Sequence, residues 1–327
     1  MRESCNCSLE TAATIVIDQN MTGDSVTLTG LTVEFTSGTT ITATIGTLDL
    51  NGTTTTDLDG TGTVILQTTV TDGSNVLLGA VTASGTNNDL TINSTEGVTL
   101  SGSVNIGATE DLNITFDTVG GATDAVTFTA SQTITANDID VSGTGGNDSI
   151  DVSSAIIAAG NVSLDTAATI DIDQNITGDI VTLTGTTVEI AGGTTITAAN
   201  GNLDLSGSTT NLDGTGAVIL QTTVTDGSNV LLGAVTASGT NNDLTINSTE
   251  GVTLSGSVNI GTTEDLDITF DTIGGGTDAV TFTTGQTITP NDIDVSGTGG
   301  TDSIDVTTAI SAAGNVRLEP AAASDHE

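Results

Sequence analysis

Residues 64–107 read VILQTTVTDGSNVLLGAVTASGTNNDLTINSTEGVTLSGSVNIG, and residues 218–261 repeat this stretch without a single change. Residues 61–160 align with residues 215–314 at an offset of 154, and 12 of these 100 positions differ. The segment from Ala12, AATIVIDQNMTGDSVTLTG, aligns with the segment from Ala167, AATIDIDQNITGDIVTLTG, at an offset of 155. Self-similarity of this kind indicates a repeat architecture.

A shorter period lies inside the long repeat. Aliphatic residues recur every 22 positions in the series Leu90, Leu112, Ile134 and Ile156, and in its copy Leu244, Leu266, Ile288 and Ile310. Val104 with Val126, and Val258 with Val280, show the same spacing. A period in the low twenties is typical of a solenoid with one coil per period. Since 154 is seven times 22, we expect the two copies to stack without a phase break.

Within each period, short runs alternate between apolar and polar residues. The run 138–141 places Ile139 and Val141 on one face and two carboxylates on the other. Such runs end in Gly, Asn or Asp, which is typical of half-buried strands followed by turns. The sequence therefore predicts an all-β parallel β-helix, or β-solenoid, with about 22 residues and about three strands per coil, in about 14 or 15 coils. The alternative is a pair of tandem β-sandwich domains.

The repeat boundaries give the expected domain organisation. Residues 1–160 form a first solenoid unit of about seven coils, and residues 161–314 form a second, near-identical unit. Residues 315–327 begin a third copy and end in a tail, because Val316 and Leu318 occupy the positions of Val162 and Leu164.

The charge is strongly one-sided. The chain has 41 Asp and Glu residues, no Lys, the two arginines Arg2 and Arg317, and a formal net charge of −39. Nucleic acids and anionic membranes bind through Lys and Arg, so neither is an expected partner. No signal peptide is visible in residues 1–14, and no apolar run reaches the length of a membrane span. From composition, we expect an extracellular or cell-surface location.

Catalysis is not expected. The chain has no Trp and no Tyr, and its single histidine, His326, lies in the tail. Carboxylate pairs alone can cleave glycosides, but the aromatic and basic residues that would hold a sugar are missing. We therefore predict no catalytic residue and no required cofactor.

Calcium is the candidate ion, because this hard cation prefers several carboxylate oxygens. Residues 143–151, GTGGNDSID, resemble the calcium-binding nonapeptide of RTX β-rolls in part, and residues 297–305 are their copy. The alternative is a Gly-rich turn before a strand. The candidate ligands are Asp138, Asp140, Asp148, Asp151, Asp292, Asp294, Asp302 and Asp305.

The terminal coils carry the candidate self-assembly residues Cys5, Cys7, Leu9, Val316 and Leu318. Cys5 and Cys7 could cross-link chains or bind a soft metal; alternatively, Cys7 is a small buried residue like Val162 in the second copy. A solenoid without caps exposes two different edges, and a head-to-tail contact between them builds filaments. We expect the chain itself as partner, with cell-surface or matrix components as further candidates.

Three segments resemble the repeats of bacterial secreted β-helical proteins, such as filamentous-haemagglutinin-like adhesins and autotransporter passengers. They are GNLDLSG from Gly201, GVTLSGSVNIG from Gly97 and Gly251, and AAGNVSLDTAATI from Ala158. The resemblance implies a surface or matrix location and a role in adhesion or scaffolding. The predicted function is a non-enzymatic subunit of a surface or matrix fibre, such as a biofilm fibre. The alternative is an adhesin stalk or a module that binds a cell surface, a glycan or, through its Thr-x-Thr runs, ice.

Overall fold

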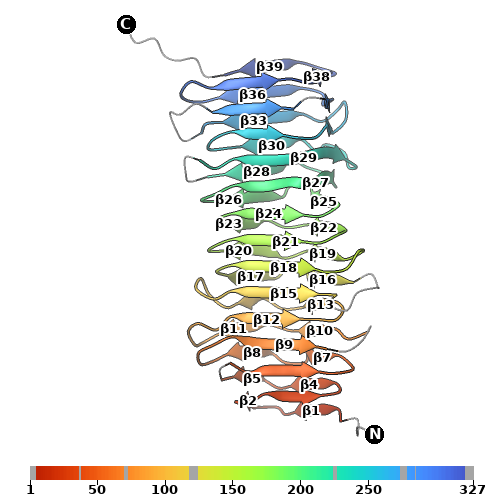
Figure 1. The fold of residues 1–327 in the computed structure, drawn as a ribbon, viewed down its shortest axis with the longest axis vertical. Helices are drawn as coiled ribbons and strands as arrows, with labels where there is room; N and C mark the ends of the chain where they lie inside the picture. Colours follow the sequence, from red (N-terminus) through yellow and green to blue (C-terminus); the bar gives the residue numbers. More distant parts are fainter. Residues whose placement is uncertain are drawn as a thin grey trace. The chain divides into compact units, whose positions relative to one another are not determined.

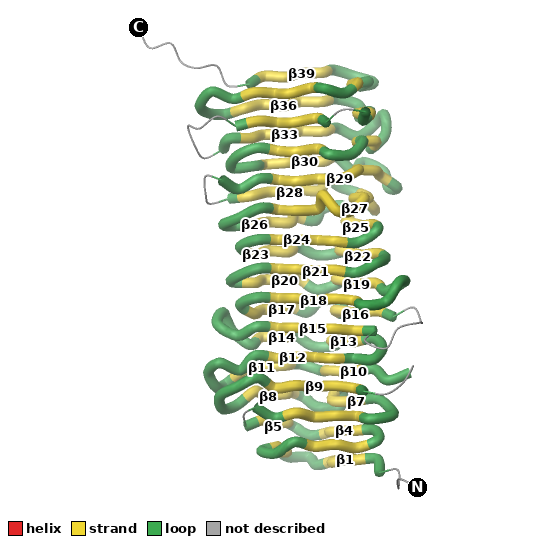
Figure 2. Tube along the Cα trace, in the orientation of Figure 1, coloured by secondary structure: helices red, strands yellow, loops and turns green. Residues whose placement is uncertain are grey.

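A computed structural model describes residues 5–36, 38–69, 73–117, 124–223, 227–272, 278–283 and 285–320. These residues form strands and turns and contain no α-helix (Figure 2). Contacts divide the chain into two compact units, residues 1–169 and 170–327. In both units the strands pair in parallel, which confirms the predicted β-solenoid and excludes antiparallel sandwiches (Figure 1).

The first unit has three ladders of stacked strands, because each strand pairs with the strand three places further along the chain. The first ladder contains β1 (Cys7–Glu10), β4 (Val26–Thr29), β7 (Leu48–Leu50), β10 (Val76–Leu78), β13 (Val98–Leu100), β16 (Ala125–Phe128) and β19 (Ser149–Val152). The second contains β2 (Thr14–Ile17), β5 (Thr32–Phe35), β8 (Thr55–Leu58), β11 (Val81–Ala83), β14 (Val104–Asn105), β17 (Thr133–Ala136) and β20 (Ala155–Ala158). The third contains β3 (Met21–Gly23), β6 (Thr40–Ala43), β9 (Val64–Thr68), β12 (Leu90–Asn93), β15 (Leu112–Phe116), β18 (Ile139–Gly143) and β21 (Val162–Asp165).

The second unit has the same three-ladder construction. One ladder contains β23 (Ile176–Gly178), β26 (Thr195–Ala198), β28 (Val218–Thr222), β30 (Leu244–Asn247), β33 (Leu266–Phe270), β36 (Ile293–Gly297) and β39 (Val316–Glu319). The other two share the long strands β27 (Leu203–Asp213) and β29 (Val230–Ala237). The first of these two ladders also contains β22 (Thr169–Ile172), β25 (Thr187–Ala191), β32 (Val258–Asn259), β35 (Thr287–Ile288) and β38 (Ala309–Ile310). The second also contains β24 (Val181–Thr184), β31 (Val252–Leu254), β34 (Ala279–Phe282) and β37 (Ser303–Val306).

Alternating side chains build the core. In β15, Leu112, Ile114 and Phe116 point inward and are buried, while the residues between them are half-buried on the outer face. The same period of two recurs in β33 and most other interior strands. The apolar residues of paired strands thus stack on one another in neighbouring turns, and the core is mostly aliphatic with a few buried Phe side chains.

The coil count and the period differ from the expected values in detail. The two units contain about 13 turns of about 23 residues, so the turns are fewer and longer than expected. Individual turns also differ in length. The turn that connects the paired residues Thr14 and Thr32 is short, whereas the turn that connects the paired residues Val104 and Ile134 is much longer. Only the strands must stack, so loops of unequal length are tolerated at the corners.

The pairing also corrects part of the predicted periodic series. Leu90 does pair with Leu112, and Ile134 pairs with Ile156. Leu112, however, pairs with Ile139 and not with Ile134. The copy repeats this pattern, because Leu266 pairs with Ile293.

The remaining pairs of the series are corrected in the same way. Val104 stacks on Ile134 rather than on Val126, and Val258 stacks on Ile288 rather than on Val280. Part of the apparent period therefore arose from alternating runs that lie in different ladders.

The long repeat does not contain a whole number of turns. From β1 to β20 it has 20 strands, which at three strands per turn is six turns and two strands. As a result β21, the copy of β1, stacks on β18 in the third ladder, whereas β1 begins the first ladder. The expected stacking without a phase break was therefore wrong, because the average turn is longer than the predicted period.

Candidate functional site

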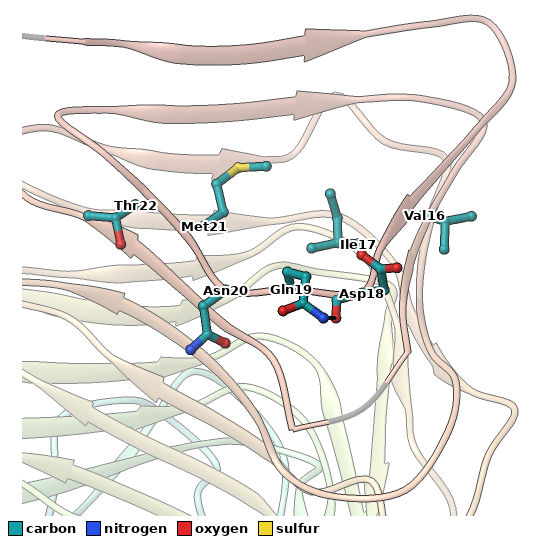
Figure 3. A pocket seen from close by; sticks show the side chains of 7 residues that line it. All are labelled: Val16, Ile17, Asp18, Gln19, Asn20, Met21 and Thr22. Atoms are coloured by element: carbon teal, nitrogen blue, oxygen red, sulfur yellow. Dashed lines mark hydrogen bonds between the residues drawn. The ribbon is translucent and has the colours of Figure 1, made fainter.

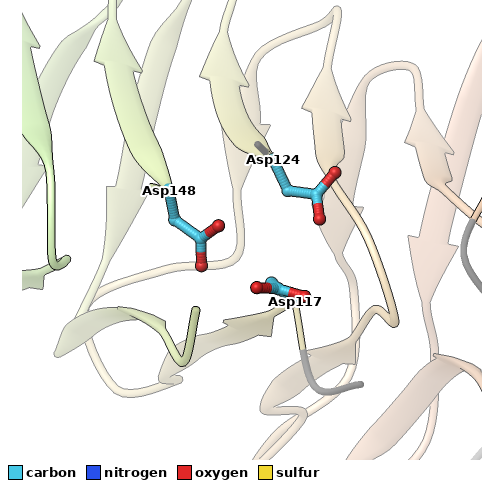
Figure 4. A group of neighbouring side chains, drawn as sticks. All are labelled: Asp117, Asp124 and Asp148. Carbon is cyan, nitrogen blue, oxygen red and sulfur yellow. The ribbon is translucent and has the colours of Figure 1, made fainter. Parts of the chain in front are cut away.

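Three carboxyl groups meet at one corner of the first unit. Asp117, Asp124 and Asp148 are all buried, and each contributes a carboxylate oxygen to a group whose members lie within 4.8 Å of one another. Figure 4 shows the carboxyl groups of Asp117 and Asp148 facing each other, with that of Asp124 beside them. We call this group the first acidic corner.

The strand register brings these residues together from two successive turns. Asp124 and Asp148 directly precede Ala125 and Ser149, which are paired partners in β16 and β19. Asp117 directly follows Phe116, the last residue of β15. Each residue therefore lies at a strand boundary, where the chain turns from one ladder to the next.

The backbone around Asp117 is shaped to admit its carboxylate. Asp117 has a φ of 49°, in the left-handed region that is uncommon for residues other than glycine. The loop 143–148 lies against it: a Cβ at Gly145 would overlap the Asp117 carboxylate and lie 2.8 Å from Asp148 Oδ2. The Gly145 N–H instead donates a hydrogen bond of 2.8 Å to that same Asp148 oxygen. Gly145 thus permits the close approach of the two turns.

The second unit contains the equivalent group. Asp271, Asp278 and Asp302 also have carboxylate oxygens within 4.8 Å of one another, and we call them the second acidic corner. The backbone is equivalent too, since Asp271 has a φ of 51° and a Cβ at Gly299 would overlap its carboxylate. The arrangement is therefore built twice, once in each copy of the long repeat.

Crowding and burial make these carboxyl groups hold protons more tightly than usual. Burial is the largest cause that raises the pKa of Asp278 to about 6, and the charges of Asp271, Glu250 and Asp302 add to it. Burial also raises the pKa of Asp148 and the pKa of Asp302. For Asp148, the Gly145 N–H opposes this rise and the charge of Asp117 adds to it. For Asp302, the Gly299 N–H and the charge of Asp271 act in the same two ways. Like charges in a low-dielectric corner disfavour full ionisation.

Of the residues predicted as calcium ligands, only Asp148 and Asp302 lie in the acidic corners. Asp138 and Asp292 lie elsewhere and take part in hydrogen bonds that link successive turns. The Asn161 N–H donates to Asp138 Oδ1 at 2.6 Å, and the Asp138 N–H donates to Asp111 Oδ1 at 3.1 Å. These carboxylates satisfy backbone donors at a corner, as capping residues do in other folds.

The other predicted ligands lie on outer strand faces. Asp140 and Asp305 are exposed, and Asp151 accepts a hydrogen bond from the hydroxyl group of Ser153 at 2.9 Å. Asp294 forms an ion pair with Arg317 at 2.9 Å.

The predicted assembly residues lie at the edges of the first and last described turns. Val316 and Leu318 in β39 are 47% and 36% exposed, and Leu9 in β1 is 40% exposed. Their equivalents Val162 and Leu164 are 1% and 0% exposed.

The cysteines lie at the edge formed by β1. Cys5 and Cys7 are free thiols, and Cys7 is half-buried rather than buried, because β1 has a paired neighbour, β4, on one side. Burial raises the pKa of the Cys7 thiol, and the neighbouring Cys5 contributes.

No protein-family model, no curated protein and no solved structure matches this chain. The described part of the chain contains no helix that could span a membrane. The chain has three basic side chains, and two of them, Arg2 and His326, lie outside the described residues. What the chain does must therefore be inferred from its own residues.

The first unit also has a shallow depression at the turn between β2 and β3 (Figure 3). It is open to solvent, and in its lining the Gln19 side-chain amide donates a hydrogen bond of 2.6 Å to the backbone carbonyl of the preceding residue, Asp18. Its lining residues are Val16, Ile17, Asp18, Gln19, Asn20, Met21 and Thr22. This composition offers no convergent set of reactive groups.

Sequence reasoning missed Asp117 and Asp124, and with them Asp271 and Asp278. A signal was present, since DTVGGATD and its copy DTIGGGTD keep both end residues although two positions between them differ. What the sequence did not provide was the ladder register that brings Asp117 and Asp124 close to Asp148.

Proposed function

We propose that this chain is a non-enzymatic structural protein whose open coil edges join head to tail into a fibre. One observation carries the proposal: Val316 and Leu318 are exposed at the last described strand, whereas the same repeat positions are buried at Val162 and Leu164. Apolar residues that the repeat buries elsewhere favour a further coil at this edge. A second copy of the chain is the occupant that we propose.

The edge formed by β39 and the edge formed by β1 differ in charge. Arg317 projects from β39, and it is the only basic side chain among the described residues. At the edge of the first unit, β1 carries the exposed Glu10 beside Leu9. Unlike edges of this kind support a heterologous contact, which extends into a filament instead of closing into a ring.

Composition and resemblance support a location outside the cell. A chain with 41 acidic residues and no Lys needs screening by salt or cations, which extracellular fluids supply. The similarity of GVTLSGSVNIG to repeats of filamentous-haemagglutinin-like adhesins favours a cell-surface or matrix setting. In that setting the chain would provide length and stiffness and would contact itself and matrix components.

The test is a pair of matched variants examined by negative-stain electron microscopy and sedimentation velocity. Val316→Asp with Leu318→Asp adds charge to the β39 edge and should abolish filaments. Ile157→Asp is the control, because Ile157 is an equally exposed apolar residue on the side of β20. It should leave filaments unchanged.

Circular dichroism of each variant reports whether the β-solenoid still forms. Filaments of the wild-type chain that are lost only in the edge variant would support the proposal. Isolated particles of the wild-type chain at all concentrations would contradict it and would favour the adhesin or binding-module alternative. Filaments that persist in the edge variant would also contradict it.

A further inference from the structure

The acidic corners have no protein cation to balance them within the described part of the chain. Arg317 is the only described basic side chain, and it is held by Asp294 and Glu319 at 2.9 and 2.5 Å. Three carboxylates within 4.8 Å repel one another strongly when they are ionised and removed from water. Their charge must therefore be neutralised from the solvent, either by protons or by a cation.

Buried carboxylate oxygens in both corners lack a hydrogen-bond donor among the described residues. Asp271 is 2% exposed, and neither of its carboxylate oxygens has a partner. Asp148 is fully buried, and its Oδ1 has no partner, although its Oδ2 accepts the Gly145 N–H. Buried acceptors without donors are costly, so such oxygens indicate a ligand that the corner is built to receive.

The size of the corner fits a particular class of ion. Oxygens bound to Ca²⁺ lie about 2.3–2.6 Å from it, so two ligands on opposite sides are separated by roughly 4.6–5.2 Å. The carboxylate oxygens of each corner lie within 4.8 Å of one another, so they are close enough to share one such ion. Oxygen ligands with several negative charges are also the set that this hard cation prefers.

We propose that each acidic corner binds one divalent, oxygen-ligated cation, with Ca²⁺ the ion that fits. Asp117, Asp124 and Asp148 supply the carboxylates of the first site, and Asp271, Asp278 and Asp302 those of the second. The cation joins two successive turns, because Asp117 and Asp124 belong to one turn and Asp148 to the next. The cation thereby holds these two turns together at a corner, where the chain passes from one ladder to the next.

Glu250 is a further acidic residue near the second acidic corner. Its charge contributes to the proton affinity of Asp278, and its Oε2 has no partner among the described residues. A backbone hydrogen bond connects Glu250 to Asp271, because the Asp271 N–H donates to the Glu250 carbonyl at 3.0 Å. In the first unit the equivalent Glu96 Oε2 accepts a bond from Asn75 at 3.4 Å. Glu250 is not one of the three residues whose carboxylate oxygens meet within 4.8 Å of one another, and the first unit has the equivalent backbone bond, since the Asp117 N–H donates to the Glu96 carbonyl at 3.2 Å.

The experiment is equilibrium dialysis of the chelator-stripped full chain against radioactive Ca²⁺, at about pH 7.5 and about 0.15 M NaCl. The wild-type chain should bind two Ca²⁺ ions. Asp271→Asn with Asp278→Asn should remove one of them, and Asp117→Asn with Asp124→Asn should remove the other. In each variant the intact corner of the other unit shows that the protein remains folded.

Asp140→Asn with Asp305→Asn is the matched control, because it removes the same number of charges from exposed positions. It should leave two ions bound. Repeating the dialysis with excess Mg²⁺ shows whether the sites prefer the larger cation. Absence of saturable binding in the wild-type chain would overturn the proposal and assign the neutralising role to protons. So would an unchanged stoichiometry in the corner variants, which would indicate adventitious binding to the acidic surface.

Discussion

Arg317 Nη1 lies 2.9 Å from Asp294 Oδ2, in a ladder that carries one more carboxylate than its counterpart in the first copy of the repeat. On the outer face of the second unit, Asp267, Asp294 and Arg317 are consecutive partners in β33, β36 and β39. The equivalent residues of the first unit are Asn113, Asp140 and Ser163. The second copy thus has one more carboxylate and one more guanidinium in the same ladder.

We expect Arg317→Ser to loosen β39 without unfolding the core, because an exposed ion pair adds little to global stability. Hydrogen exchange measured by mass spectrometry should show faster exchange across residues 316–319 and unchanged exchange in β33. The second substitution Asp267→Asn recreates the ladder of the first unit and should restore much of the protection. If Asp267→Asn has no effect in the Arg317→Ser background, charge balance is not what holds this strand.

Much of the fold was predictable, because the signal is periodic and local. Alternation in runs such as 138–141 gives strands, and the near-identity of the two copies gives a repeat. The coil register was only partly predictable. Leu112 pairs with Ile139, and no local signal separates that partner from Ile134, which lies nearer in the sequence. Both are aliphatic residues in alternating runs, and loop length decides which one stacks.

The acidic corners show the same limit at the level of the site. Asp148 stood out because it lies in a Gly-rich motif, but its partners Asp117 and Asp124 come from a different segment. Their convergence depends on the pairing of β16 with β19, which is known only once the register is known. Asp138 was an equally reasonable candidate by sequence. The structure places it in a ladder of hydrogen bonds to backbone N–H groups.

Gly145 and Gly146 provide a matched pair of substitutions for the first corner. Gly145→Ala places a methyl group against the Asp117 carboxylate, whereas a Cβ at Gly146 meets nothing within 4 Å. We expect Gly145→Ala to destabilise the first unit by about 1–3 kcal/mol, as overpacking does. Gly146→Ala should have little effect. Urea unfolding followed by far-ultraviolet circular dichroism is the measurement, since the chain has no Trp or Tyr for fluorescence. Equal effects of the two substitutions would contradict the close approach of the two turns.

Leu164 and Leu318 test the energetic value of the stacked core at one repeat position. Leu164 is fully buried, so Leu164→Ala should cost about 2–5 kcal/mol through lost burial and the cavity that it leaves. Leu318 is 36% exposed at the edge strand, and Leu318→Ala should cost less than about 1 kcal/mol in dilute, unassembled protein. The comparison uses urea unfolding at a concentration where sedimentation shows single chains. A large loss for Leu318→Ala under those conditions would mean that the edge strand is part of the stable core.

The pH dependence of stability should have opposite signs with and without calcium. The pKa of Asp278 is raised from 3.8 to about 6, so the folded chain holds this proton more tightly than the unfolded chain. Stability must then fall as pH rises from about 4 to about 6 and stay level above that range. A rise of this size in the pKa of Asp278 lowers the free energy of unfolding at neutral pH by about 3 kcal/mol.

In a chelating buffer, the melting temperature should therefore be higher at about pH 4 than at about pH 7, and Asp278→Asn should shrink that difference. Added Ca²⁺ favours the ionised carboxylates, so it should raise the melting temperature at about pH 7 and have little effect at about pH 4. Melting followed by circular dichroism checks both expectations. Asp140→Asn serves as the control for general charge repulsion, because Asp140 is exposed and belongs to neither corner. If Asp278→Asn and Asp140→Asn changed the pH dependence equally, net charge would explain the effect and the buried corner would not.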